Sequence, residues 1–126
     1  MFGGSASINF SLDANIPALT GKVILVTGGN NGLGKESILQ LAKHEPAEIW
    51  MGAHNAERAR TAIEDIQKHV PNSVSIKLLL MDLPSFVSIS EVATTFRKQS
   101  SRLDILMLNA GTVITPAGLT DDGYEI

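Results

Sequence analysis

The sequence has no cysteine among its 126 residues, which excludes disulfide scaffolds, thiolate metal sites and cysteine nucleophiles. It also has no excess of basic side chains, since ten Lys and Arg stand against thirteen Asp and Glu for a net charge of −3. Proteins that coat nucleic acid or lie on a membrane surface need such an excess. We therefore expect no nucleic-acid partner.

Long hydrophobic runs are missing as well. The longest ones, such as residues 78–81 and 105–108, are far shorter than the ~20 apolar residues needed to cross a bilayer. Residues 1–10 have neither the basic start nor the apolar stretch of a secretory signal. The sequence therefore predicts no insertion into a membrane and an intracellular protein, with the cytoplasm as the expected compartment.

Short apolar runs rich in β-branched residues alternate with segments of helical periodicity. Strands are predicted at 22–27, 48–53, 74–81 and 103–108, because these runs are mostly apolar, as in a sheet covered on both faces. Helices are predicted from Leu33 to about 45, from Ala56 to about 69 with Asn55 as N-cap, and from Pro84; another helix is expected to begin at Thr120.

This order predicts consecutive β-α-β units with right-handed crossovers. The fold class is α/β, with a Rossmann-type doubly wound parallel sheet that is truncated after about four strands. In the expected strand order 3-2-1-4, the first two helices cover one face and the third covers the other. Residues 1–20 are expected to form an irregular arm, and residues 21–126 a partial dinucleotide-binding domain.

The strongest chemical signal is a glycine-rich turn between the first strand and the first helix, Thr27-Gly-Gly-Asn-Asn-Gly-Leu-Gly34. A diphosphate needs backbone N–H groups, the positive end of a helix dipole, and a close approach that a Cβ atom would obstruct. Gly28 would allow the sharp turn, Gly32 the close approach, and Gly34 the packing of helix on sheet. The spacing lacks the Gly-Lys-Ser/Thr ending of a P-loop. The alternative interpretation is an inert, solvated turn.

The residues after the second predicted strand bear on which dinucleotide is bound. An acidic residue there would accept hydrogen bonds from a ribose 2′-hydroxyl and select NAD, but the sequence has Ala53-His54-Asn55. No carboxylate would repel a 2′-phosphate, so NADP(H) is favoured over NAD(H), with His54 or Arg58 to hold the phosphate and Lys35 as a further candidate. The alternative is that His54 is a loop residue and Asn55 a helix cap.

These motifs resemble those of the short-chain dehydrogenases/reductases. The glycine-rich turn is similar to the family's Thr-Gly-x-x-x-Gly-x-Gly motif, Asp82-Leu83 to its adenine-contacting pair, and Leu108-Asn109-Ala110-Gly111 to its Asn-Asn-Ala-Gly element. Residues 119–125 resemble the retinol-dehydrogenase-like and WW-domain-oxidoreductase-like branch.

The resemblance implies a role for each motif. Gly28, Asn31, Gly32 and Leu33 would meet the diphosphate and adenosine side, Asp82 and Leu83 the adenine, and Asn109 to Gly111 the ribose while bracing the sheet. The full set of candidate cofactor-binding residues is Gly28, Asn30, Asn31, Gly32, Leu33, His54, Asn55, Asp82, Leu83, Asn109, Ala110 and Gly111. No metal ligand is expected.

The family's catalytic serine and Tyr-x-x-x-Lys pair are expected downstream of this chain's end, so no catalytic residue is assigned. The only tyrosine, Tyr124, is interpreted as a surface or packing residue. The chain is thus predicted to be the NAD(P)(H)-binding portion of an oxidoreductase acting on a carbonyl or alcohol of a small molecule, inactive alone. The alternative is a non-catalytic nucleotide-binding or interaction protein that assembles through its open sheet edge. Either way, self-association or pairing with a missing C-terminal half is expected.

Overall fold

The computed structural model describes residues 8–112 and 116–125. Residues 1–7 of the predicted arm, residues 113–115, and Ile126 of the predicted last helix lie outside the described residues. Within the described part, four parallel strands form one sheet in the order β3-β2-β1-β4. They are β1 (Val23–Thr27), β2 (Glu48–Ala53), β3 (Ser75–Leu80) and β4 (Ile105–Met107). The predicted α/β fold and strand order are confirmed.

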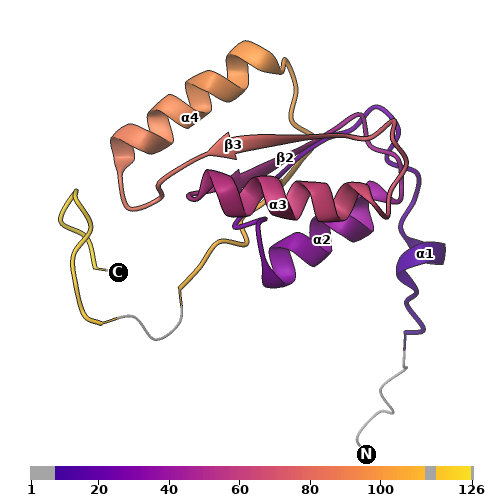
Figure 1. Ribbon diagram of the computed structural model, residues 1–126, viewed down its shortest axis with the longest axis horizontal. Helices are drawn as coiled ribbons and strands as arrows, with labels where there is room; N and C mark the ends of the chain where they lie inside the picture. Colours follow the sequence, from indigo (N-terminus) through magenta and orange to yellow (C-terminus); the bar gives the residue numbers. More distant parts are fainter. Residues whose placement is uncertain (1–7, 113–115, 126) are drawn as a thin grey trace, which may run out of the picture.

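The helices are divided unequally between the two faces of the sheet. Figure 1 shows α2 (Gly32–Ala42) and α3 (Ala56–Gln67) together on one face and α4 (Phe86–Gln99) on the other. The two-helix face holds the larger core, in which Ile38 of α2 and Ile66 of α3 pack against apolar side chains of the strands. On the other face, Phe96 of α4 meets the ring of Trp50 edge-on, with centroids 5.2 Å apart. This division is the predicted one.

Two predicted boundaries on the one-helix side are wrong. Helix α4 begins at Phe86 rather than at Pro84, because Ser85 is its N-cap and accepts a hydrogen bond from the N–H of Ser88 at 3.3 Å. Strand β4 has three residues, although the apolar run that predicted it has six. Only Ile105, Leu106 and Met107 pair with β1, opposite Ile24, Leu25 and Val26.

The helix predicted from Thr120 is not formed in residues 120–125. Leu119 and Glu125 pair as an antiparallel bridge instead, and the N–H of Thr120 donates to the Tyr124 carbonyl at 2.7 Å. Gly123 supplies the left-handed turn between them with a φ of 84°. The dipeptide Asp122-Gly123 between the paired residues Leu119 and Glu125 is typical of a tight turn.

The predicted arm is more ordered than expected. Residues 12–15 form a single helical turn, α1 (Leu12–Asn15), and Leu19 is buried in the core beside α2 and α3. The N–H of Leu19 donates to the His44 carbonyl at 2.8 Å, which ties the end of the arm to the end of α2. Across the described residues, no helix has both the length and the apolar character needed to span a membrane.

Asp104 fastens β4 to β1 at the edge of the sheet where these strands begin. Its carboxylate accepts the N–H of Val23 at 2.8 Å, and its own N–H donates to the Val23 carbonyl at 2.9 Å. Arg102 and Lys22 pair with the same carboxylate. The Arg102 guanidinium, and after it the Val23 N–H, lower the pKa of Asp104 to about 2.

A folded-state pKa below the unfolded value means that Asp104 stabilises the fold above pH ~4 and that this stabilisation is lost as the pH falls toward 2. Asp104→Asn should therefore lower the melting temperature at pH 7, with a difference from the unchanged chain that shrinks steadily between pH 5 and pH 2. Thermal unfolding followed by circular dichroism at several pH values measures this. The exposed Asp121→Asn is the control, and equal losses at pH 7 and pH 2 would refute the assignment.

Candidate functional site

The predicted site residues lie in the four segments that follow the strands, at one edge of the sheet. Because all four strands are parallel, their carboxyl ends meet there, and each carries one part of the set: Gly28 after β1, His54 after β2, Asp82 after β3 and Asn109 after β4. The order β3-β2-β1-β4 reverses direction at β1, so the glycine-rich turn follows the strand at the topological switch point. Ligands of open α/β sheets bind in the crevice at this point.

The glycine-rich turn has the backbone that its sequence predicts. Gly28 and Gly32 have left-handed φ values of 66° and 49°. A Cβ on Gly28 would lie 2.9 Å from the Ala110 Cα, and one on Gly34 would lie 2.6 Å from the Asn109 Nδ2. Beside Gly32, by contrast, a Cβ would meet no atom within 4 Å. Gly28 and Gly34 therefore allow tight packing against the end of β4, and Gly32 borders open space.

Asn109 and Ala110 join the end of β4 to the end of β1. The Asn109 Nδ2 donates to the carbonyls of Thr27 at 3.1 Å and Gly28 at 3.4 Å, and the Ala110 N–H donates to the Thr27 Oγ1 at 3.0 Å. The bracing role that the resemblance implied for this element is thus present in the structure. Because the Asn109 side-chain amide donates to β1, it is not available to a ligand. The backbone of residues 109–111 is the part of this segment that borders the crevice.

The N-terminus of α2 is uncapped, unlike those of α3 and α4. Asn55 caps α3 by accepting the Arg58 N–H at 2.9 Å, as predicted, whereas the side chain of Asn31, the N-cap of α2, accepts no such hydrogen bond. The first N–H groups of a helix need acceptors, and together with the helix dipole they favour an anion. The Asn55 Oδ1 accepts the Arg58 N–H, so this oxygen is less available to a cofactor than the sequence suggested.

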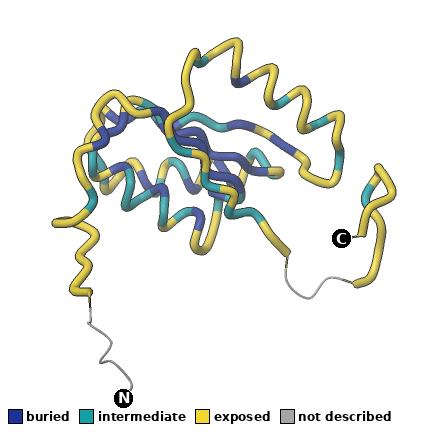
Figure 2. The backbone as a smooth tube through the Cα atoms, turned by 180° about the vertical axis from the view of Figure 1, so that it is seen from behind, coloured by how far each residue is buried: buried dark blue, intermediate teal, exposed yellow. Residues whose placement is uncertain are grey.

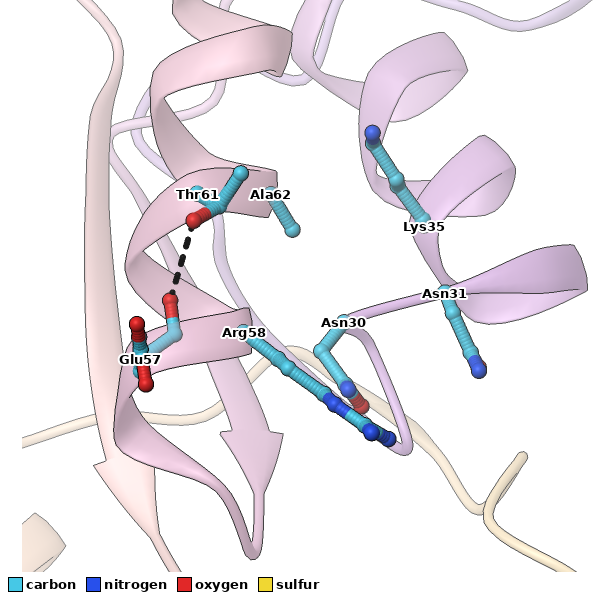
Figure 3. A pocket seen from close by; sticks show the side chains of 7 residues that line it. All are labelled: Asn30, Asn31, Lys35, Glu57, Arg58, Thr61 and Ala62. Carbon is cyan, nitrogen blue, oxygen red and sulfur yellow. Dashed lines mark hydrogen bonds between the residues drawn. The ribbon is translucent and has the colours of Figure 1, made fainter.

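A cavity of about 440 Å³ lies between the glycine-rich turn and α3. In Figure 3 the Arg58 guanidinium reaches toward Asn30, while the Glu57 carboxylate points away from it. Among the described residues, Arg58 lines the cavity and His54 does not, although both were candidates for a 2′-phosphate. The lining residues are Asn30, Asn31, Lys35, Glu57, Arg58, Thr61 and Ala62.

Lys35 lines the same cavity but is paired with a residue that the sequence analysis did not single out. Its Nζ binds the Asp65 Oδ2 at 3.0 Å, and Lys68 binds the Asp65 Oδ1 at 2.9 Å. The two ammonium groups, with Lys68 the larger cause, lower the pKa of Asp65 to about 2. Lys35 and Asp65 lie 30 positions apart, so only the packing of α2 beside α3 brings them together.

The loop after β3 contributes exposed side chains. Asp82 and Leu83 are both exposed, and the Asp82 N–H donates to the Ser88 Oγ at 2.9 Å, which fixes the backbone ahead of α4. Leu33, at the start of α2, is 82% exposed. These side chains border the carboxyl edge of the sheet and are free to contact a ligand there.

A second, apolar groove of about 490 Å³ lies on the one-helix face of the sheet. Leu25, Leu79 and Phe96 form its buried floor, and Leu106 and Leu108 stand exposed at its rim. Figure 2 shows that α4 is largely exposed, in contrast to the buried strands beside it. The groove runs beside β4, the strand at the open sheet edge.

The reversal of strand order and the glycine-rich turn between β1 and α2 are features of a Rossmann-type α/β domain. The family model for short chain dehydrogenases matches residues 22–122, and the chain belongs to this family. It is 40% identical over 110 residues to a short-chain dehydrogenase/reductase of Aspergillus calidoustus, covering 87% of this chain and 34% of that protein. It is 35% identical over 113 residues to human retinol dehydrogenase 13, covering 90% and 33%.

Solved structures show the same fold. L-sorbose reductase from Gluconobacter frateurii, complexed with NADPH and L-sorbose, superposes with a TM-score of 0.67 and 25% identity, covering 75% of this chain and 35% of that one. Hydroxysteroid dehydrogenase from Escherichia coli gives a TM-score of 0.65 and 28% identity, covering 75% and 38%. The chain spans about a third of the length of the curated relatives it matches.

The glycine contacts predict which substitutions the turn tolerates. Gly34→Ala should lower the free energy of unfolding by about 1–3 kcal/mol, because its Cβ would clash with the Gly28 carbonyl and the Asn109 amide. Gly111→Ala is the matched control, since its Cβ would meet nothing within 4 Å. Urea unfolding at pH 7 measures both, and equal effects would contradict the packing role of Gly34.

Proposed function

We propose that this chain binds NADP(H) in preference to NAD(H) at the carboxyl edge of the sheet. It would act as the cofactor-binding part of an oxidoreductase that acts on a carbonyl or alcohol of a small molecule. The observation that carries the proposal is the uncapped N-terminus of α2 beside a cavity into which Arg58 extends. When bound, the nicotinamide supplies or accepts the hydride.

Each part of the edge has a role in holding the cofactor. The N–H groups at the start of α2 bind the diphosphate, with Gly32 leaving room for close approach. Leu33 borders the diphosphate and adenosine side, the backbone of residues 109–111 borders the ribose, and Asp82 with Leu83 borders the adenine. Asn30 and Asn31 line the adenosine end of the crevice.

Arg58 is the proposed ligand of the 2′-phosphate. Its planar guanidinium can donate two parallel hydrogen bonds to phosphate oxygens. The residue at the end of β2 is His54 rather than an acid, so no carboxylate at that position repels the phosphate. The NADPH complex of the structurally similar L-sorbose reductase is consistent with this choice.

The chemical step needs a proton donor and a cation beside the nicotinamide. Tyr124 does not offer this pair, since its ring packs against Phe86 with centroids 5.2 Å apart and it lies in the hairpin beyond α4. We propose that the family's serine and Tyr-x-x-x-Lys residues belong to a segment outside these 126 residues. The chain alone would then bind the cofactor without turning over substrate.

Arg58→Met should weaken binding of adenosine 2′,5′-bisphosphate about tenfold, because it removes a charge-assisted hydrogen bond to the 2′-phosphate. Binding of 5′-AMP, which lacks this group, should change less than about twofold. Isothermal titration of the full 126-residue chain measures both. Arg60→Met, on the same helix but outside the cavity lining, is the control. Failure of the unchanged chain to bind either nucleotide would refute the proposed function.

A second proposal concerns the apolar groove on the one-helix face. Parallel sheets are normally covered on both faces, and Leu106 is 52% exposed beside the open edge of β4. We propose that the 126-residue chain covers this face by self-association. This also favours the second candidate function, a nucleotide-binding protein that acts by assembly.

Leu106→Lys should shift the chain toward monomer, since a charge at the groove rim opposes burial of the face. Sedimentation velocity at micromolar concentrations measures the change. Leu12→Lys is the matched control, because Leu12 is 46% exposed on α1 and outside the groove. A chain that is already monomeric before substitution would refute self-association.

A further inference from the structure

The cavity beside the glycine-rich turn has two basic residues in its lining, and they are oriented differently. Arg58 extends its guanidinium toward Asn30 at the glycine-rich turn (Figure 3). Lys35 starts from α2 on the other side of the cavity, and Figure 3 shows its ammonium group pointing away from Arg58 and Asn31. Only one of the two cations is therefore directed at the turn.

Asp65 is what holds Lys35 in this orientation. Asp65 lies on α3 three positions after Ala62, which lines the cavity, and its Oδ2 binds the Lys35 Nζ at 3.0 Å. Its Oδ1 binds Lys68, a residue of the same helical surface, at 2.9 Å. Lys35 is therefore not needed to neutralise Asp65, because Lys68 remains as its partner.

We propose that Asp65 is a specificity-determining positioning residue, which keeps Lys35 away from the 2′-phosphate subsite and so limits how strongly the site distinguishes NADP(H) from NAD(H). This inference rests on the proposed cofactor site. Asp65 acts through Lys35 and itself touches no part of the cofactor. With Asp65 neutral, Lys35 is free to reach the phosphate as a second cation beside Arg58.

The size of the effect follows from the exposure of the pair. The side chains of Lys35 and Asp65 are 34% and 46% exposed, and exposed ion pairs are weak. The lysine stem is flexible, so release of the ammonium group requires no change in the backbone of α2. Release of the Lys35 ammonium group from Asp65 should tighten binding of a 2′-phosphorylated nucleotide about three- to fivefold. This factor matches the small free energy of an exposed ion pair between Lys35 and the phosphate.

The test is a double-mutant cycle on the full chain, with adenosine 2′,5′-bisphosphate and 5′-AMP as probes. Dissociation constants are measured by isothermal titration for the unchanged chain, Asp65→Asn, Lys35→Met and the double variant. The readout is the ratio of the two dissociation constants, which cancels a general gain in affinity for anions. Glu64→Gln is the matched control, since it removes one negative charge from the neighbouring position on α3.

The proposal expects Asp65→Asn to raise the preference for the 2′-phosphate about three- to fivefold, and expects this gain to vanish when Lys35 is Met. Glu64→Gln should leave the ratio unchanged. A gain that persists in the double variant, or that Glu64→Gln reproduces, overturns the inference, because the effect then comes from net charge and not from Lys35.

The cycle also separates this inference from the proposed function. If the unchanged chain binds adenosine 2′,5′-bisphosphate in an Arg58-dependent manner and Asp65→Asn leaves the ratio unchanged or lowers it, the proposed function stands and the inference falls. If the unchanged chain binds neither nucleotide, both fall.

Discussion

The hydrogen bonds between the end of β4 and the end of β1 are the interaction on which the candidate site depends. The Asn109 side chain donates to the carbonyls of Thr27 and Gly28, and the Ala110 N–H donates to the Thr27 hydroxyl. These bonds fix where β1 ends and the glycine-rich turn begins. The turn leads directly into α2, whose N-terminus points to the crevice. Gly28 and Gly34 pack closely against Ala110 and Asn109, where a Cβ atom would not fit. The glycine-rich turn and the end of β4 therefore form one packed unit. A change in either alters the position of the backbone N–H groups that would bind a phosphate.

The two faces of the sheet differ in how completely they are covered, and the proposed cofactor site and the proposed assembly surface lie on different faces. The face under α2 and α3 carries the larger core, and its helices also form the cavity that contains Arg58 and Lys35. The face under α4 is only partly covered and leaves an apolar groove along β4. The chain spans about a third of the length of these relatives.

Particular elements show why sequence reasoning succeeded in some places and failed in others. The strands and the two helices of the larger face follow from local apolar periodicity, and the Asn55 cap from a local side-chain preference. The start of α4 was misplaced because Pro84 and Ser85 are both acceptable near a helix start, and the hydrogen bond from Ser88 to Ser85 decided between them. The helix expected at Thr120 failed because the turn at Gly123 outweighed the helical propensity of its neighbours.

The sequence by itself determined the family, the order of strands and helices, and the presence of a glycine cradle after β1, because each depends on residues that are close together in the chain. The charge arrangement of the cavity was decided only by the tertiary structure. The sequence placed His54, and not Arg58, in the set of cofactor-binding residues, with Arg58 only an alternative ligand for the 2′-phosphate. The position of α3 beside the turn placed Arg58, and not His54, in the cavity lining. The ion pair of Lys35 with Asp65 joins helices α2 and α3 across 30 positions, and no local pattern marks it. Distances between side chains of different helices depend on how those helices pack, which is why the structure was needed to find it.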